Sequence, residues 1–196
     1  MSNPKIKIQS IENLSQNTHY KYKRIHFELE VEENLWETQS REVLDRGNGV
    51  TILLFNPKKQ SVILTRQFRV PTYMNGNSSG LMIEACAGVI EDDSPEQSII
   101  RETEEETGYK IAKPQKIFEA YMSPGAVTEI IYFYVAEYSD STKISQGGGL
   151  KEECEHIEVL EMKMIEALRL MEEGEIKDAK TMLLLQYAQL KNLCLV

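Results

Sequence analysis

Glutamates crowd onto one edge of a predicted helix that ends near Gly108. Glu102 and Glu106 are four residues apart, so an α-helix places them on one face, with Glu105 beside them. Carboxylates this close repel one another unless a cation holds them together. Ligand sets made of oxygen alone favour Mg²⁺ or Mn²⁺ over zinc. The stretch therefore predicts a divalent-metal platform suited to phosphate chemistry.

The same helix carries clear start and stop signals. Ser94 is a suitable N-cap, with Gln97 three residues later as in a capping box, and Pro95 fits the first helical position. Gly108 is suited to end the helix in the left-handed conformation. The side opposite the acids offers residues to bury, namely Ile99, Ile100 and Thr103. We therefore expect an anchored helix whose acidic edge faces a cleft.

The composition is that of an ordinary globular protein with one substantial core. Of the 196 residues, 41% are hydrophobic and 27% are charged. With Lys+Arg 22 against Asp+Glu 31, the net charge is -9, which argues against a general surface for nucleic acid or anionic membrane. A phosphate substrate must therefore be met by local cations and metal.

The lack of a recognisable targeting segment and the cysteine pattern both point to the cytoplasm. No stretch approaches the roughly 18 consecutive apolar residues of a membrane span, and the first ten residues lack the apolar run of a signal peptide. Cys86, Cys154 and Cys194 are odd in number and widely spaced, which predicts buried or incidental thiols and neither a disulfide framework nor a zinc site. We expect a cytoplasmic protein without a membrane partner.

The elements before the helix are predicted to be strands. Apolar residues alternate or cluster at strand length in three N-terminal segments, which are residues 5–12, 20–31 and 35–45. A turn at 46–49 closes this small β-rich unit, so the predicted domains are 1–45 and 46–196. Residues 50–55 and 61–68 then predict a hairpin that is buried on both faces.

The elements after the helix complete an α/β fold. In chain order they are strands near 115–121 and 129–137, a glycine-rich loop at 146–149, a strand near 157–162, and helices at 163–172 and 180–192. The methionine and leucine stripes of these two helices predict core packing and not cofactor contacts. Helices flanking a mixed sheet are the expected architecture.

Together, the strand, glycine loop and acidic helix resemble the Nudix box of the pyrophosphohydrolase superfamily. Three features depart from that pattern: Asp93 stands where the pattern has Glu, four residues instead of five separate Gly88 from Asp93, and Thr103 replaces the usual aliphatic residue. The resemblance implies an α/β/α sandwich around a mixed sheet. It also implies a magnesium site, for which Mn²⁺ is a possible substitute; the residues expected there are Glu102, Glu106, the Ala87 carbonyl and Glu105, with Arg101 clamping the glutamates.

Motifs outside the box indicate the branch of the superfamily. Pro124, sixteen residues past Gly108 in the segment YMSPG, resembles the signature of the ADP-ribose and nucleotide-sugar pyrophosphatases. Further stretches resemble the branch members that act on GDP-mannose; they are LDRGNG, RQFRVPTYMNGN, EACAG, QGGG and GEIKDAKT. This resemblance, and not any spacing, implies hydrolysis of GDP-mannose to GMP and mannose 1-phosphate. The alternatives are an ADP-ribose pyrophosphatase and a non-catalytic nucleotide-sugar sensor.

Several cations and acids are candidate substrate contacts. Arg66 and Arg69 lie near the end of a predicted strand, where at least one guanidinium can give bidentate donors to a diphosphate, and Lys180 can add a point charge. The alternative is that strand-end arginines are solvated or paired with the excess acids. By resemblance, Arg41 and Glu42 contact substrate, and Glu129 is a weaker candidate for a substrate or metal contact.

A general base is still required, because a water that attacks phosphorus must lose a proton. The resemblance implies that this base comes from a mobile acidic loop, here residues 147–156. Glu155 is the expected base and an additional metal ligand, and Glu153 is the second candidate. The loop glycines would let it close over substrate. The alternative is a set of solvated loop acids.

The predicted N-terminal strands are too few to form a core of their own. Their apolar face should therefore pack on something else. The resemblance suggests the partner subunit of a homodimer, with Arg41 or its neighbours reaching the other active site.

Overall fold

The computed structural model describes residues 5–15, 20–150, 152 and 155–194. The chain divides into two compact units. One comprises the chain up to Asn48 together with Tyr121–Ile130, and the other comprises Gly49–Ala120 together with the chain from Ile131 onward. The candidate metal ligands and the glycine-rich loop all lie in the second unit.

The first unit is an antiparallel sheet in the order β1-β2-β3. Its strands are β1 (Ile6–Asn13), β2 (Lys21–Glu32) and β3 (Leu35–Asp45), close to the predicted segments. The later segment of this unit joins it through Leu44, which donates its N–H to the Ala126 carbonyl at 2.8 Å and accepts from Thr128 at 3.0 Å. Residues distant in sequence therefore complete this unit.

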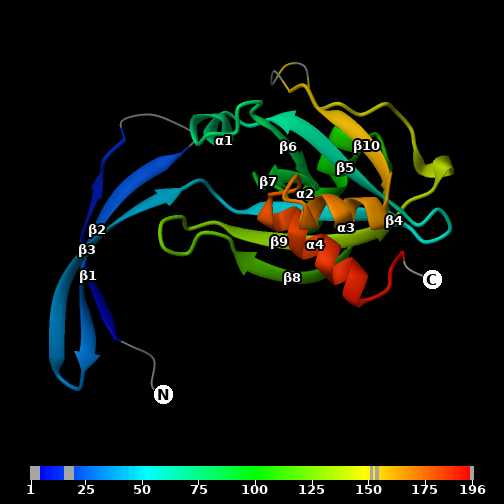
Figure 1. Ribbon diagram of the computed structural model, residues 1–196. Helices are drawn as coiled ribbons and strands as arrows, with labels where there is room; N and C mark the ends of the chain where they lie inside the picture. The colour runs from blue at the N-terminus through cyan, green and yellow to red at the C-terminus, as the bar shows by residue number, and fades with distance from the viewer. Residues whose placement is uncertain (1–4, 16–19, 151, 153–154, 195–196) are drawn as a thin grey trace. The chain divides into compact units, whose positions relative to one another are not determined.

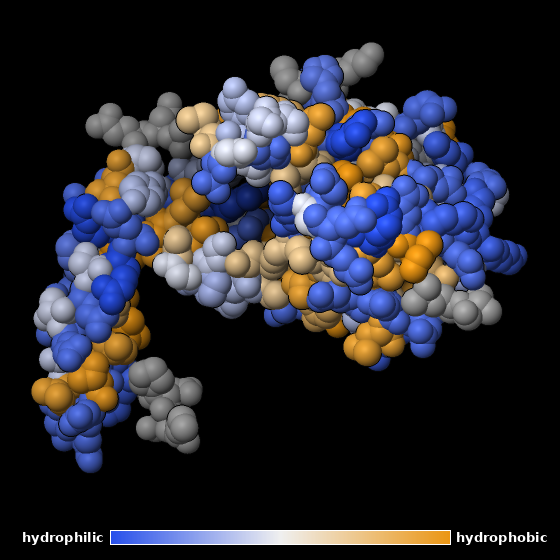
Figure 2. All heavy atoms as spheres, in the orientation of Figure 1, coloured by the Kyte–Doolittle hydropathy of each residue, from blue (hydrophilic) through white to orange (hydrophobic). Residues whose placement is uncertain are grey.

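One face of this sheet presents apolar side chains to solvent. Ile6, Ile8 and Ile11 are more than half exposed, and they pair across the ladder with Leu29, Phe27 and Ile25, respectively. A register shift between Ile8 and Ser10 keeps Ile11 on the same face as Ile8, because side chains otherwise alternate along a strand. Figure 2 shows hydrophobic side chains at the surface of this sheet.

The second unit is built on a mixed sheet of seven strands within the described residues (Figure 1). The strand order is β10-β5-β4-β9-β8, with β6 also paired to β5 and β7 to β4. The strands are β4 (Gly49–Asn56), β5 (Ser61–Phe68), β6 (Leu81–Glu84), β7 (Cys86–Val89), β8 (Gln115–Tyr121), β9 (Ile130–Glu137) and β10 (Glu158–Lys163). Strand β4 runs parallel to β9 and antiparallel to β5, and the predicted hairpin is confirmed.

Helices flank this sheet, as expected for the predicted α/β class. They are α1 (Val70–Met74), α2 (Pro95–Glu102), the π-helical η1 (Thr103–Thr107), the 3-10 helix η2 (Asp140–Thr142), α3 (Met164–Glu172) and α4 (Ala179–Leu190). Ile99 of α2 packs in a buried cluster with Val50, Ile52 and Leu54 of β4. Helices α3 and α4 contact each other (Figure 1) and pack on β5 and β4, respectively. Neither α1 nor β6 was predicted.

No helix among the described residues has the length and apolar character needed to cross a membrane.

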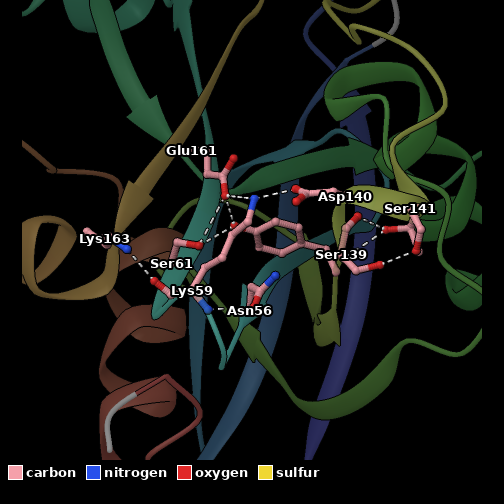
Figure 3. A network of polar contacts seen from close by, with 10 residues as sticks. Asn56, Lys59, Ser61, Ser139, Asp140, Ser141, Glu161 and Lys163 are labelled. Atoms are coloured by element: carbon pink, nitrogen blue, oxygen red, sulfur yellow. Dashed lines mark hydrogen bonds and ion pairs between the residues drawn. The ribbon is translucent and has the colours of Figure 1, made fainter.

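A polar network fastens one end of the sheet (Figure 3). The buried Tyr138 hydroxyl forms hydrogen bonds with Ser61 at 2.6 Å and with Glu161 at 2.9 Å. Glu161 also accepts from the Lys59 ammonium at 3.0 Å, and Lys59 pairs with Asp140. These contacts join the β4–β5 turn to β10 and to the segment after β9.

Candidate active site

The acidic helix begins as the sequence predicts. Ser94 Oγ accepts from the Gln97 backbone N–H at 3.3 Å, and Gln97 Oε1 accepts from the Ser94 N–H at 3.1 Å, which completes a capping box. Pro95 occupies the first turn, and Gly108 ends the helical stretch with φ 75°, in the left-handed region. The helix is therefore fixed at both ends.

The acidic turn itself is not a regular α-helix. From Thr103 to Thr107 the backbone is π-helical, a geometry frequently found at functional sites. Thr103 and Thr107 are buried and donate their hydroxyls to the carbonyls of Ile99 at 2.6 Å and Thr103 at 2.5 Å, respectively. Hydroxyls that bond the carbonyl four residues back compete with the helical N–H donors. Both threonine hydroxyls are thereby satisfied inside the turn that carries the glutamates.

Glu106 is the most deeply buried of the helix carboxylates, at 3% exposure. Its Oε2 accepts from the Ala87 N–H at 3.2 Å, which ties the helix to strand β7. The pKa of Glu106 is raised to about 8, mainly by burial; the charges of Glu102 and Glu155 act in the same direction, and the hydrogen bonds from Cys86 and Ala87 oppose the shift. Three carboxylates therefore act on one another at this point.

Glu102 lies against the glycine of strand β7. A Cβ built on Gly88 would lie 2.1 Å from Glu102 Cδ, so only glycine leaves room for this carboxylate. Arg101 pairs with Glu102 and with Glu105, each at 2.8 Å. Burial raises the pKa of Glu102 to about 7, although the charge of Arg101 opposes this shift. Arg101 thus holds two of the three helix carboxylates.

These residues fit a hard divalent cation such as Mg²⁺. The donors that Glu102 and Glu106 offer are oxygens, and both carboxylates are desolvated next to further negative charge. A bound cation would offset the cost that raises their pKa values. Within the described ranges, no three His, Cys, Asp or Glu side chains are grouped as a ligand set, and Arg101 pairs with Glu102 and Glu105.

The glycine-rich loop lies against the end of the acidic helix. The N–H groups of Gly148 and Gly149 donate to the carbonyls of Glu106 at 2.9 Å and Glu105 at 3.1 Å. Both glycines have positive φ, at 111° and 77°, which favours glycine at these positions. These bonds satisfy carbonyls that the helix end would otherwise leave unpaired.

The loop brings Glu155 to the acidic helix. Glu155 Oε2 accepts from the Leu150 N–H at 3.1 Å, and its charge raises the pKa values of Glu102 and Glu106. The other candidate base, Glu153, lies outside the described residues. Glu155 is therefore the candidate base that the structure can place near the helix carboxylates.

The candidate phosphate anchors of the second unit are all paired. Arg69 bonds Glu84 through Nε at 2.9 Å, and Lys180 pairs with Asp178 at 2.7 Å. Arg66 pairs with Glu158 across the β5–β10 ladder, Nε donating at 2.7 Å. Acid pairing of both arginines is what the alternative interpretation of strand-end arginines expects.

Three further candidate residues belong to the first unit. Arg41 donates to the Ser40 carbonyl and to Gln39, both at 2.9 Å. Glu42 accepts from Arg24 at 2.8 Å and from the Tyr22 hydroxyl, and Glu129 pairs with Arg46 at 3.4 Å. Each of these contacts lies within the first unit.

Sequence reasoning missed three residues beside the candidate site. Glu84 and Asp178 hold Arg69 and Lys180, and Cys86 is buried with its pKa raised by burial and by Glu106. Asp178 had a local signal, because it stands three residues before Thr181 as the N-cap of α4. Glu84 and Cys86 stand in EACAG, one of the stretches that carry the resemblance, but no local pattern indicated their partners, which are distant in sequence.

Comparisons with known proteins show similarity over most of the chain. The family model described as NUDIX domain matches residues 45–185. The GDP-mannose pyrophosphatase of Yersinia pestis (strain Pestoides F) is 51% identical over 187 residues, 94% of this chain and 93% of the relative. Those of Escherichia coli O1:K1 / APEC and Shigella flexneri serotype 5b (strain 8401) are each 56% identical over 153 residues, 78% of this chain and 79% of the relative.

Proposed function

Because this chain belongs to the NUDIX family, we propose that it hydrolyses the diphosphate of GDP-mannose, releasing GMP and mannose 1-phosphate. The names of the relatives support the nucleotide sugar. The observation that carries the chemistry is the pair of carboxylates formed by the buried Glu106 and the partly buried Glu102, next to Glu155. A non-catalytic sensor would not need this crowding of negative charge.

Glu102 and Glu106 would hold Mg²⁺ together with the Ala87 carbonyl, Glu105 and Glu155. When bound, the cation polarises the diphosphate and offsets its charge. Arg101 keeps Glu102 and Glu105 oriented through its two ion pairs. Glu155 is proposed to accept the proton of the water that attacks phosphorus, and Glu153 is the alternative base. The bond between phosphorus and the bridging oxygen then breaks, and each product keeps one phosphate.

Arg69 and Lys180 are proposed to bind the diphosphate. Arg69 offers a planar fork of donors, and Lys180 offers an ammonium with three N–H donors. Arg41, Glu42 and Glu129 are proposed as further substrate contacts. These three residues are proposed on the family resemblance of the sequence around them. Their contacts in the structure are with other residues of the first unit, namely Ser40, Arg24 and Arg46.

We also propose a homodimer that works in the cytoplasm. The exposed Ile6, Ile8 and Ile11 support the dimer, because they give the N-terminal sheet an apolar face that a second copy can cover. The free, buried thiols of Cys86 and Cys194 suit a reducing compartment.

A substrate panel tests this assignment. Purified full-length protein is incubated with Mg²⁺ and GDP-mannose, GDP-glucose or ADP-ribose, and the products are identified by mass spectrometry. We expect the highest kcat/KM with GDP-mannose and the products GMP and mannose 1-phosphate. A preference for ADP-ribose would replace the substrate but keep the reaction, whereas no magnesium-dependent hydrolysis would favour the sensor.

A further inference from the structure

Glu84 holds the Arg69 guanidinium by one edge. A single Glu84 oxygen, Oε2, accepts from Arg69 Nε at 2.9 Å and pairs with Nη2 at 2.7 Å. The Glu84 side chain is 7% exposed, whereas that of Arg69 is 39% exposed. Because the guanidinium is planar, a carboxylate on the Nε edge leaves the edge between the two terminal nitrogens directed elsewhere. That edge has the geometry for bidentate contact with a phosphate.

Asp178 holds Lys180 and the start of helix α4 at the same time. Its Oδ1 pairs with the Lys180 ammonium at 2.7 Å. Its Oδ2 accepts from the Thr181 N–H at 3.0 Å and from Thr181 Oγ1 at 2.6 Å. The carboxylate takes one of the three ammonium donors, so Lys180 keeps donors for an anion.

The two pairs are parts of one framework. Thr181 Oγ1 accepts from the N–H of Ala85 at 2.6 Å, and Ala85 follows Glu84 directly in the chain. Burial lowers the pKa of Arg69, but Glu84, Glu106 and Asp178 together raise it above its ordinary value. Arg69 therefore lies within electrostatic reach of both the Asp178 pair and the metal-binding carboxylate Glu106.

We propose that Glu84 and Asp178 are positioning residues, which fix Arg69 and Lys180 as a two-cation clamp for the diphosphate. The inference rests on the proposed function. Long cationic side chains lose much rotamer freedom when they bind an anion. Here the carboxylates impose that loss before the anion arrives, so more of the interaction energy remains for binding.

Two substitutions at Asp178 separate positioning from charge. Asp178→Asn and Asp178→Ser remove the same negative charge, and Asn and Ser both cap helices well. Asparagine has a single acceptor oxygen, which can stay on Lys180 if its NH2 group turns to Thr181 Oγ1, whereas serine has no oxygen that reaches Lys180. Binding is measured by titration calorimetry of the full chain with Mg²⁺ and inorganic imidodiphosphate, whose P–N–P bridge resists hydrolysis. We expect Asp178→Ser to weaken binding about tenfold and Asp178→Asn by no more than about threefold.

The same comparison applies at Glu84, where Glu84→Gln keeps an oxygen near Arg69 and Glu84→Met keeps only the shape of the side chain.

A double-mutant cycle shows whether Asp178 acts through Lys180: Asp178→Ser should weaken binding no further in a Lys180→Ala background. Glu173→Gln is the control, because Glu173 pairs with Arg169 on the surface of α3 at 2.6 Å and should leave binding unchanged. Thermal melting checks that each variant is folded.

Four results would overturn the inference: equal binding by the Asn and Ser variants, fully additive losses in the cycle, no binding of imidodiphosphate by the wild type, or tighter binding by both neutral variants than by the wild type. Tighter binding by both neutral variants would show that the carboxylates compete with the diphosphate instead of positioning its cations. Failure of the proposed function looks different, because the wild type would then not hydrolyse GDP-mannose while the imidodiphosphate affinities still followed the expected order.

Discussion

At the scale of single residues, Glu106 carries a charge that the free protein disfavours. Its pKa is raised to about 8 because the carboxylate is buried beside other acids. The same burial is what makes the residue suitable for a cation, since electrostatic attraction is stronger where water is excluded. The cost to folding and the benefit to metal binding therefore have one cause.

The raised pKa predicts how stability depends on pH. The folded protein binds this proton more tightly than the unfolded chain, whose glutamates titrate near 4.5. Between about 4.5 and about 8, the unfolding free energy contributed by Glu106 should therefore fall as pH rises. We expect the melting temperature in EDTA to fall over this range less steeply in Glu106→Gln than in the wild type.

Magnesium should reverse this trend, because it binds the deprotonated carboxylates. The increase in melting temperature caused by Mg²⁺ should be larger at pH 8.5 than at pH 6 in the wild type and small at both in Glu106→Gln. A magnesium effect that is equal at both pH values would contradict the assignment of Glu106 as a metal ligand.

Glu155 and Glu153 are distinguished by matched substitutions. If Glu155 is the base, Glu155→Gln should lower kcat by roughly 10²–10⁴. The kcat of Glu153→Gln should then stay near that of the wild type. Steady-state kinetics at saturating Mg²⁺ measures both. The reverse order would move the base to Glu153, and two innocuous substitutions would mean that the proton leaves by another route, such as Glu105 or bulk water.

At the scale of elements, the consecutive helices α2 and η1 both contact strand β7. The Ala87 N–H holds Glu106, and the missing side chain of Gly88 makes room for Glu102. The strand thus shapes the site through its backbone, while the helix supplies the carboxylates.

Gly88→Ala tests this pairing. The new Cβ would lie 2.1 Å from Glu102 Cδ, so the flexible glutamate must move away. We expect the hydrolysis rate to fall at least about tenfold with little change in melting temperature, because a displaced side chain costs less than a displaced backbone. A variant with normal magnesium-dependent activity would show that Glu102 is not needed where the structure places it.

Local signals explain which elements the sequence could predict. The capping box at Ser94 and the glycine stop at Gly108 are local, and so is the apolar run of β4; all three agree with the structure. Helix α1, with five residues, and strand β6, with four, are too short to show a period.

Contacts between residues that are distant along the chain explain which features the sequence could not predict. Glu84 holds Arg69 across a tertiary contact, and Ala85 meets Thr181 from a segment 96 residues away. The π-helical turn from Thr103 to Thr107 leaves no mark that a periodicity analysis of apolar residues registers. The candidate glutamates could be found by spacing, whereas their supporting partners could not.

At the scale of the whole molecule, the exposed apolar face of the N-terminal sheet predicts self-association. Light scattering at micromolar concentration should give twice the chain mass of 22.5 kDa. Ile8→Glu should yield a monomer, because a charge would enter the covered face. Thr38→Glu is the matched control, since Thr38 pairs with Glu28 on the opposite face and should leave the dimer intact. A monomeric wild type would remove this hypothesis.

The proposed hydrolysis of GDP-mannose requires magnesium held by the acidic helix. The most direct measurement is the rate of GMP release from GDP-mannose at saturating Mg²⁺ by the wild type, Glu106→Gln and Glu104→Gln. Glu104 is an exposed glutamate of the same turn and serves as the matched control. We expect Glu106→Gln to lower kcat by more than about a hundredfold and Glu104→Gln to remain near the wild type. Near-normal turnover by Glu106→Gln, or equal losses in both variants, would contradict the account.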